Sequence, residues 1–191
     1  MDVFEFPLND KKEVKQGDLL IAEPFLSDPN FARSVVLVCE HSSEGSFGLV
    51  INKPAELSIE EATNFMFVDN NIFVGGPVEQ DTLHFIHTIA QLENAIPLKN
   101  GVYWGGDYEQ LKEMNADGMV NKRNCRFFAG YSGWGKGQLK GELDDDSWVI
   151  SRIPLDILFE LDADKIWQEV LRLMGNRYKI LSNYPIDPRL N

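Results

Sequence analysis

The two histidines that stand closest together are the first place to look for metal chemistry. His84 and His87 are three positions apart, a spacing that puts two imidazoles on one face of a helix, where both can bind a zinc ion. Their segment, Leu83-His84-Phe85-Ile86-His87, instead has the pattern of a strand, in which positions i and i+3 point to opposite faces of the sheet. Since no cysteine pair and no second histidine cluster completes a ligand set, we predict no metal site and no other cofactor.

Ser132 is the strongest candidate for a nucleophile. It lies in Gly130-Tyr131-Ser132-Gly133-Trp134, which is similar to the G-x-S-x-G elbow of serine hydrolases except that Trp134 stands at the closing position. The elbow requires a small residue there because a strand and a helix approach each other closely around a strained serine. The three histidines of the chain are the available bases, but the pattern contains no complete triad. We therefore assign no catalytic residues.

The densest group of carboxylates comes shortly afterwards. Glu142, Asp144, Asp145 and Asp146 offer oxygen atoms, which are the ligands that Mg²⁺ and Ca²⁺ prefer. The group lacks the ligand alternation and the central glycine of a calcium loop. We interpret it as a solvated turn between a helix and the strand that begins at Trp148.

Anion binding is a third possibility, at a glycine-rich segment over residues 130–138 that leads from a strand into a predicted helix over 137–143. Backbone N–H groups at the start of that helix, with Lys136 beside them, would attract an anion. The alternative is that the glycines only permit positive φ angles in a crowded corner. The sequence contains no phosphate-binding loop of the G-x-x-x-x-G-K-S/T or G-x-G-x-x-G type.

These residues must be positioned by short strands with a few helices between them. Apolar and β-branched runs predict the strands, and capping residues predict the helices. The predicted strands cover 19–23, 34–40, 47–52, 71–75, 82–87, 101–104, 126–131 and 148–152, and residues 41–46 close a hairpin. The predicted helices cover 58–66, 108–114 and 137–143, a short one from Pro154, and a longer one from Asp162 or Asp164 to just before Gly175. Their irregular order favours a mixed-sheet domain of the α/β or α+β class.

The charge of the chain argues against direct DNA binding. There are 30 acidic and 18 basic residues, which give a formal charge of −12, and an acidic surface repels both phosphate backbones and anionic membranes. The one basic cluster, Lys122-Arg123-Asn124-Cys125-Arg126, brings three positive charges, fewer than a stable phosphate footprint requires. The pattern also contains no helix-turn-helix pair.

The cysteines and the termini point to the cytoplasm. Cys39 and Cys125 are far apart in apolar surroundings, which predicts two reduced and partly buried thiols. Residues 1–16 are polar and charged, so they predict a loosely attached arm rather than a signal peptide. The apolar runs are far shorter than the roughly 20 residues that span a bilayer. We expect a cytoplasmic protein with no membrane association.

A series of motifs resembles the bacterial AlgH/YqgE family over about residues 17–175. In order, the motifs read GDLLIAEP (17–24), DPNFARSVV (28–36), CEH (39–41), GLVINKP (48–54), GGPV (75–78), LH (83–84), GYSGW (130–134), GQL (137–139) and EL (142–143), followed by Trp148. The segment from Arg177 to Asn191 departs from the family pattern.

The resemblance implies a single domain over residues 17–191, with a small inserted subdomain around 71–125. Its fold would be of the α/β (α+β-like) class, a mixed and partly barrel-like sheet flanked by helices. Members of the family are often labelled transcriptional regulators, and no catalytic residues or cofactor come with the resemblance. We therefore predict a regulator that acts indirectly through a protein or small-molecule partner. The alternative is an enzyme or an anion- or metabolite-binding domain that uses the 130–138 corner.

The polar and aromatic members of these motifs are the candidate site for a ligand or partner. They are Arg33, His41, Asn52, Trp134, Lys136, Gln138 and Glu142. His41 and Asn52 would face one another if the predicted hairpin forms. In the structural alternative, His41 and Asn52 satisfy turn amides, Arg33 pairs with an acid, and Trp134 fills the core.

Overall fold

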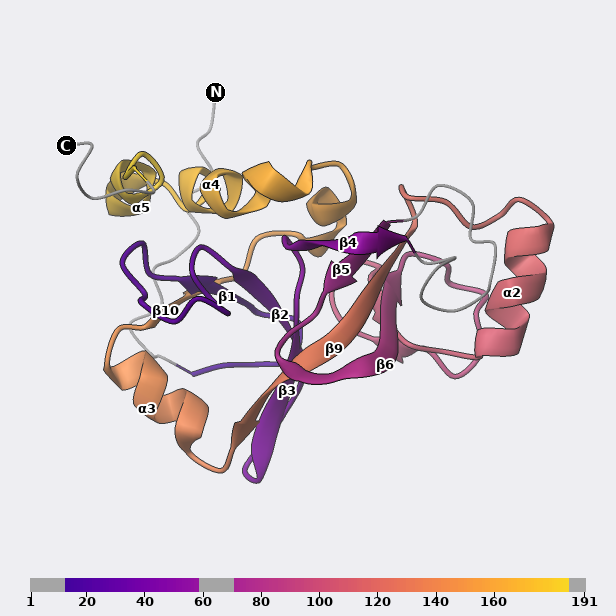
Figure 1. Cartoon of the computed structure of the whole chain (residues 1–191), viewed down its shortest axis with the longest axis horizontal. Coiled ribbons are helices and arrows are strands. Elements are labelled where there is room, and N and C mark those ends of the chain that lie inside the picture. Colours follow the sequence, from indigo (N-terminus) through magenta and orange to yellow (C-terminus); the bar gives the residue numbers. More distant parts are fainter. Residues whose placement is uncertain (1–12, 59–70, 186–191) are drawn as a thin grey trace.

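The protein folds around one open sheet with helices on both sides. A computed structural model describes residues 13–58 and 71–185 of the 191-residue chain. Within these residues, ten strands form the sheet, and its main path runs β10-β1-β2-β3-β9-β6-β8-β7 (Figure 1). The strands are β1 (Leu19–Ala22), β2 (Val35–Ser42), β3 (Gly45–Val50), β4 (Pro54–Ser58), β5 (Asn71–Val74), β6 (Val78–His87), β7 (Ile96–Pro97), β8 (Tyr103–Trp104), β9 (Cys125–Gly135) and β10 (Trp148–Ser151). The helical elements are α2 (Tyr108–Ala116), α3 (Gln138–Asp144), the 3₁₀ helix η1 (Leu155–Phe159), α4 (Ala163–Leu173) and α5 (Asn176–Leu181).

The sheet is mixed, because β5 lies parallel to β9 whereas the other paired strands are antiparallel. It is not closed, since β10 and β7 stand at the two ends of the path and do not pair. The predicted fold class, a mixed sheet flanked by helices, is confirmed. The barrel that the resemblance suggested is not completed.

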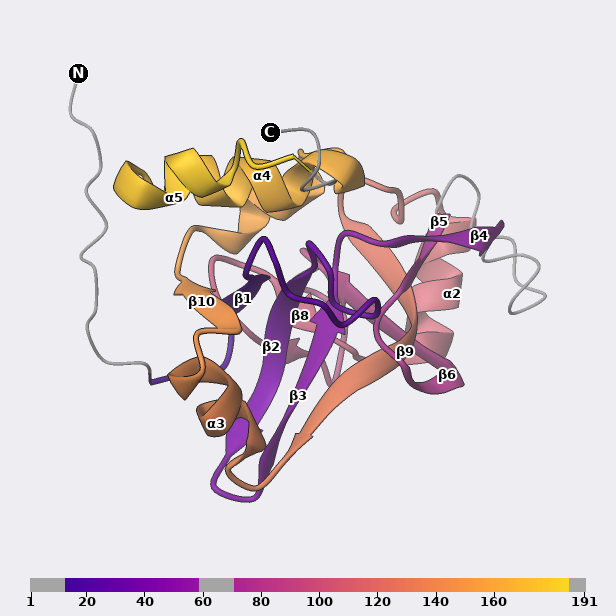
Figure 2. The ribbon, with the colours of Figure 1, turned by 60° about the vertical axis from the view of Figure 1, so that its left-hand side comes forward.

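β1, residues Val35–Cys39 of β2 and residues Gly48–Val50 of β3 are buried because both faces of the sheet are covered there. One face packs against η1 and α4 through residues such as Leu37 and Trp167. The opposite face packs against α3 through Val36, Leu139 and Leu143. Figure 2 shows α4 and α3 on the two sides of these strands. The sheet is therefore the middle layer of three in this part of the molecule.

Strand β9 joins the two halves of the sheet. One of its edges pairs with β6, and the other pairs with β5 along the first half of β9 and with β3 along the second. Backbones crowd where the two partners meet: a Cβ on Gly75 would lie 2.3 Å from the carbonyl oxygen of Gly130, whose own φ is +68°. These motif glycines therefore allow the backbone at the end of β5 to approach β9 closely, since no side chain fits there.

A second hydrophobic cluster joins α2 to β6 and the start of β9, through Phe85, Leu111 and Phe127. It lies within the predicted subdomain around 71–125, whose separate status stays a prediction. Of the predicted arm, residues 13–16 are described and lie against the domain: Val14 is buried, and Nε2 of Gln16 donates to the carbonyl of Cys39 at 2.9 Å.

The predicted elements match the observed ones closely. Each of the eight predicted strands is present, and Asp107 caps α2 by accepting a hydrogen bond from the amide of Gln110 at 2.9 Å. Asp162 is at the N-cap of α4, but its carboxylate pairs with Lys165 and caps no amide. Sequence reasoning missed β4, β7 and α5. Ser58, the predicted cap of the first helix, is the last residue of β4, and the rest of that helix lies outside the described residues.

None of the helices in the described part of the chain is long and apolar enough to cross a bilayer. Both cysteines are free and buried, as predicted.

Candidate functional site

The start of β9 buries a charged side chain whose hydrogen-bonding capacity is not fully met. Arg126 is only 8% exposed. Its neighbours Cys125 and Phe127 belong to the cluster around α2. Because side chains alternate along a strand, Arg126 is directed to the opposite face, where the residues after η1 cover it.

One hydrogen bond and two aromatic rings hold the guanidinium of Arg126. Its Nη2 donates to the carbonyl of Leu161 at 2.9 Å, and its central carbon lies 5.4 Å from the ring centre of Phe73 and 5.8 Å from that of Phe159. Its Nη1 is buried and has no hydrogen-bond partner. Burial lowers the pKa of Arg126 to about 10, although the charge of Asp162 opposes this shift. The group is therefore charged at neutral pH, and its Nη1 lacks an acceptor.

Arg126 lines a cleft of about 810 Å³ between the start of β9 and the segment from η1 into α4. Its volume falls within the range of about 300–1,000 Å³ that is usual for clefts that bind small molecules. Lys122 and Arg123 also line it, and both are exposed. The basic cluster of the sequence is thus part of the wall of a cleft.

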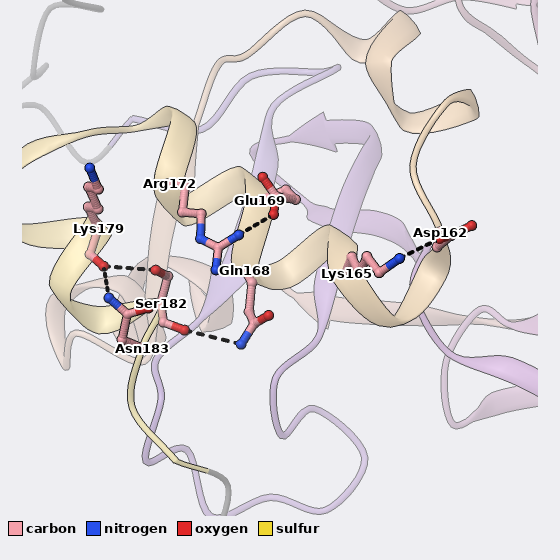
Figure 3. Close-up of polar contacts among 8 residues, drawn as sticks. All are labelled: Asp162, Lys165, Gln168, Glu169, Arg172, Lys179, Ser182 and Asn183. Atoms are coloured by element: carbon pink, nitrogen blue, oxygen red, sulfur yellow. Dashed lines mark hydrogen bonds and ion pairs between the residues drawn. The ribbon is translucent and has the colours of Figure 1, made fainter.

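Carboxylates line the same cleft from η1 and the start of α4. They are Asp156, Glu160 and Asp162. Figure 3 shows Asp162 in its ion pair with Lys165, whose Nζ lies 2.7 Å from Oδ2. The hydrogen bond from Lys165 lowers the pKa of Asp162, and the charges of Arg126 and Lys122 lower it further. Asp162 is therefore ionised at neutral pH, and the cleft carries both signs of charge.

The seven predicted site residues do not line this cleft. Three of them surround α3. Oε2 of Glu142 accepts hydrogen bonds from the indole Nε1 of Trp134 and of Trp148, both at 2.8 Å, and Oε1 accepts one from Nε2 of Gln138 at 3.0 Å. Phe31 packs against both indoles, with ring centres 6.3 Å and 5.5 Å away. The arrangement ties α3 to β9 and β10.

Of two more predicted residues, His41 lies near the tip of the β2–β3 hairpin, and Lys136, between β9 and α3, contacts that tip. His41 is exposed, and its Nδ1 lies 2.7 Å from the hydroxyl of Ser46, its partner in the strand register. Lys136 forms an ion pair with Glu44 at 3.3 Å, and both side chains are more than 70% exposed. Solvent screens such a pair strongly, so it adds little to stability.

The other two predicted residues lie at the far end of the same hairpin. Oδ1 of Asn52 accepts from the amide of Val35 at 2.8 Å, and its Nδ2 donates to the carbonyl of Arg33 at 2.9 Å. The prediction that His41 and Asn52 face one another is wrong. Val36 pairs with Val50 in the hairpin, so Asn52 lies beside the first residues of β2 whereas His41 lies near the turn.

Arg33 fastens the C-terminal segment and pairs with no acid among the described ion pairs. Its guanidinium carbon lies 4.6 Å from the ring centre of Trp167, and Nη2 donates to the carbonyl of Pro185 at 2.7 Å. Phe25 adds an edge-to-face contact with Tyr184, with ring centres 5.3 Å apart. The segment that departs from the family pattern therefore packs, up to residue 185, against the loop before β2.

Ser132 is not at an elbow. It lies inside β9, is fully buried, and donates its hydroxyl to the carbonyl of Gly75 at 3.1 Å. At the nearby start of α3, Gly137 has a φ of +76°, and Oε1 of Gln138 accepts from the amide of Gly135 at 3.1 Å. The corner thus uses a left-handed glycine to turn from strand into helix. Anion binding there stays a prediction.

The two close histidines lie on β6 and find partners within the fold. Nε2 of His87 donates to the carbonyl of Gly105 at 2.8 Å, and its Nδ1 accepts from the amide of Ile89 at 3.1 Å. Nε2 of His84 lies 3.0 Å from the hydroxyl of Thr82. Burial lowers the pKa of both imidazoles. Among residues 13–58 and 71–185, no group of three or more His, Cys, Asp or Glu side chains is arranged to hold a metal ion.

From the sequence, Arg126 counted only as one of three cations in a basic cluster. The signal that marks it is its place in an apolar strand, between Cys125 and Phe127. An arginine in such a position is buried, and buried charges require partners. The second wall of the cleft was beyond sequence reasoning, because η1 and α4 reach Arg126 only through the tertiary fold.

Sequence comparisons place close relatives among bacterial proteins. Residues 19–179 match a family model described as AlgH-like. A UPF0301 protein from Cytophaga hutchinsonii is 48% identical over 182 residues, which cover 92% of this chain and 98% of that protein. A UPF0301 protein from Bacteroides thetaiotaomicron is 37% identical over 192 residues, which cover all of this chain and 97% of that protein.

Two solved structures share the fold. The solution structure of the AlgH protein from Pseudomonas aeruginosa matches with a TM-score of 0.70 and 27% identity, over 92% of this chain and 98% of that one. A crystal structure of a protein from Corynebacterium diphtheriae matches with a TM-score of 0.74, over 92% of this chain and 95% of that one. At 24% identity, the second match shows the fold alone.

Proposed function

Because this chain belongs to the AlgH-like (UPF0301) family, we propose that it is a regulatory protein that acts on transcription indirectly, by binding a small anionic ligand in the Arg126 cleft. One observation carries the proposal: a buried, charged guanidinium lines a cleft with one of its nitrogens unpartnered. An unmet donor on a buried cation costs stability, at least about 1–3 kcal/mol. An acceptor brought by a ligand would recover that free energy.

The surroundings of the basic cluster support a small ligand rather than DNA. Lys122, Arg123 and Arg126 face a cleft that carboxylates also line. Direct DNA binding relies on cations that meet several phosphates on an open surface. The formal charge of −12 acts against such binding at longer range. We also propose a cytoplasmic location, which the two free and buried cysteines support.

Thermal unfolding with simple anions tests the binding step. We expect hexanoate to raise the melting temperature of the wild-type protein, because it combines a carboxylate with an apolar chain that suits the aromatic walls. Arg126→Met, which keeps a side chain of similar length without the charge, should abolish the shift. Lys136→Gln, which removes a distant exposed cation, should retain it. The proposal fails if neither hexanoate nor inorganic phosphate raises the melting temperature of the wild type. It also fails if the melting temperature of Arg126→Met still rises with hexanoate.

Transcript profiles of the host test the regulatory step. A strain carrying Arg126→Met should reproduce the transcript changes of a deletion strain, at an unchanged level of the protein, whereas Lys136→Gln should behave as wild type. In mobility-shift assays at low salt, we expect the purified protein to leave the migration of promoter DNA unchanged. A salt-sensitive shift that survives Arg126→Met would instead favour direct DNA binding.

A further inference from the structure

The positive and the negative side chains of the cleft come from different segments of the chain. Its cations lie just before β9 and at the start of that strand, at Lys122, Arg123 and Arg126. Its carboxylates belong to η1 and to the residues between η1 and α4. In Figure 1, α4 lies over the sheet to which β9 belongs. A ligand in this cleft therefore meets positive charge from one segment and negative charge from the other.

Aromatic and aliphatic side chains fill the space between these charges. Phe73 and Phe159 both line the cleft and flank the guanidinium of Arg126. Pro54 and Leu161 line it as well. Such walls favour an apolar body, because its burial removes hydrocarbon surface from water.

The mixture of charges narrows the class of ligand. A multiply charged phosphate would suit the cations, but the carboxylates at Asp156, Glu160 and Asp162 would repel it. A simple cation would be repelled by Arg126, and a neutral hydrocarbon would leave its Nη1 without an acceptor. A molecule with one carboxylate and one ammonium group meets the demands of both walls.

The size of the cleft favours a ligand larger than a single amino acid. At about 810 Å³, it lies in the upper part of the usual range for clefts that hold drug-sized molecules, about 300–1,000 Å³. A peptide of two or three residues has this size, and its two ends carry the opposite charges. Its side chains supply the apolar body.

From this juxtaposition we infer that the cleft binds a short peptide with free amino and carboxyl ends and apolar side chains. Its carboxylate would meet Arg126, and its ammonium group would meet the carboxylates of η1 and of the segment that leads into α4. The inference rests on the proposed function, in which Arg126 binds an anionic group, and it assigns that group to the terminal carboxylate of a zwitterionic peptide. In physiological terms, the protein would respond to products of peptide breakdown.

Calorimetric titration with one dipeptide and its blocked forms tests the inference. We use L-leucyl-L-phenylalanine, its N-acetyl form and its C-terminal amide as probes. The free dipeptide should bind with one site per chain, and each blocked form should bind at least tenfold more weakly. Arg126→Met should abolish binding of the free dipeptide.

The acidic wall needs a test of its own. The double variant Asp156→Asn/Glu160→Gln should bind the free dipeptide about tenfold more weakly than the wild type does. Its affinity for the N-acetyl form should be almost unchanged, because that form has no ammonium group for the carboxylates to bind. Asp144→Asn, an exposed carboxylate on α3 far from the cleft, is the matched control and should bind as wild type. These variants change exposed side chains, so circular dichroism should show an intact fold.

The possible failures point to different errors. If the N-acetyl form binds as tightly as the free dipeptide, the ammonium subsite does not exist and the peptide inference is overturned, while the anion proposal stands. The same holds if hexanoate binds and no dipeptide does. If the C-terminal amide binds as well as the free acid, Arg126 does not select the peptide carboxylate and the peptide inference is overturned. If no anion binds at all, the proposed function itself is overturned.

Discussion

Two charged side chains, the half-buried Glu142 on α3 and the buried Arg126 at the start of β9, differ in how fully their hydrogen-bonding capacity is met. The carboxylate of Glu142 accepts three hydrogen bonds, two of them from buried indoles. The guanidinium of Arg126 donates one to a carbonyl and leaves Nη1 without a partner. A charged group that the fold satisfies serves the fold, whereas one left unsatisfied beside a cleft has capacity for a ligand.

This contrast changes the role assigned to residues of the family motifs, from ligand binding to support of the fold. Trp134 and Glu142 are polar or aromatic members of those motifs, and the sequence favoured them as a binding site. In the structure they hold a helix against two strands. Arg126, which lies outside the quoted motifs, is a buried cation whose Nη1 has no hydrogen-bond partner.

The largest effect expected from the contrast is on Glu142. Glu142→Ala leaves two buried indole N–H groups without their acceptor, so we expect the free energy of unfolding to fall by about 2–4 kcal/mol. Asp144→Ala, on the same helix and exposed, should change it by less than about 0.5 kcal/mol. Denaturant unfolding measures both. A loss below about 1 kcal/mol for Glu142→Ala would mean that the indoles do not depend on it.

A smaller effect should follow from removing one of the two indole donors. Trp148→Phe keeps an aromatic ring against Phe31 but loses the hydrogen bond to Glu142, so we expect a loss of about 1–2 kcal/mol. Combining it with Glu142→Ala should give less than the sum of the two single effects, because the two residues share that bond. Strict additivity in this double-mutant cycle would argue against the shared bond.

Arg126 should behave differently when its charge is removed. Arg126→Met removes a desolvated charge and an unmet donor while keeping an apolar side chain between two rings, so we expect stability within about 1 kcal/mol of the wild type, in either direction. Thermal and denaturant unfolding without ligand measure it. If this variant loses as much stability as Glu142→Ala, Arg126 is a structural residue and the contrast between the two sites disappears.

The smallest effect is expected at the hairpin tip. Lys136→Gln breaks an exposed ion pair with Glu44, and we expect the free energy of unfolding to fall by less than about 0.5 kcal/mol. Raising the salt concentration should reduce even this difference, since salt screens exposed charges. A larger and salt-independent loss would mean that the pair supports the packing of α3.

The comparison also shows what can be predicted from sequence in this fold. The strand over 34–40 and the cap at Asp107 are local features. A run of β-branched residues predicts the first, and a single polar side chain predicts the second. The pairing of Trp134 and Trp148 with one carboxylate depends on where α3 lies between β9 and β10, which no local pattern specifies. The error over His41 and Asn52 has the same origin, because the pairing of β2 with β3 places them at opposite ends of the hairpin.

The cleft was out of reach for a related reason. Its walls come from segments around residues 122–126 and 156–163, which β9, α3 and β10 separate in the sequence. The basic cluster was visible in the sequence, but its facing carboxylates were not recognisable as its neighbours. The burial of Arg126 was the one part that its apolar neighbours indicated.

The order of strands in the sheet has a consequence for how the protein is made. Leu19 in β1 pairs with Ser151 in β10, and Gly45 in β3 pairs with Gly135 in β9. Contacts between such distant parts of a chain give slow folding, on a scale of milliseconds to seconds for sheets of high contact order. A ribosome delivers the apolar strands β1 to β3 first and their partners β9 and β10 much later. The nascent chain must therefore keep these apolar strands from aggregating until most of the protein has been synthesised.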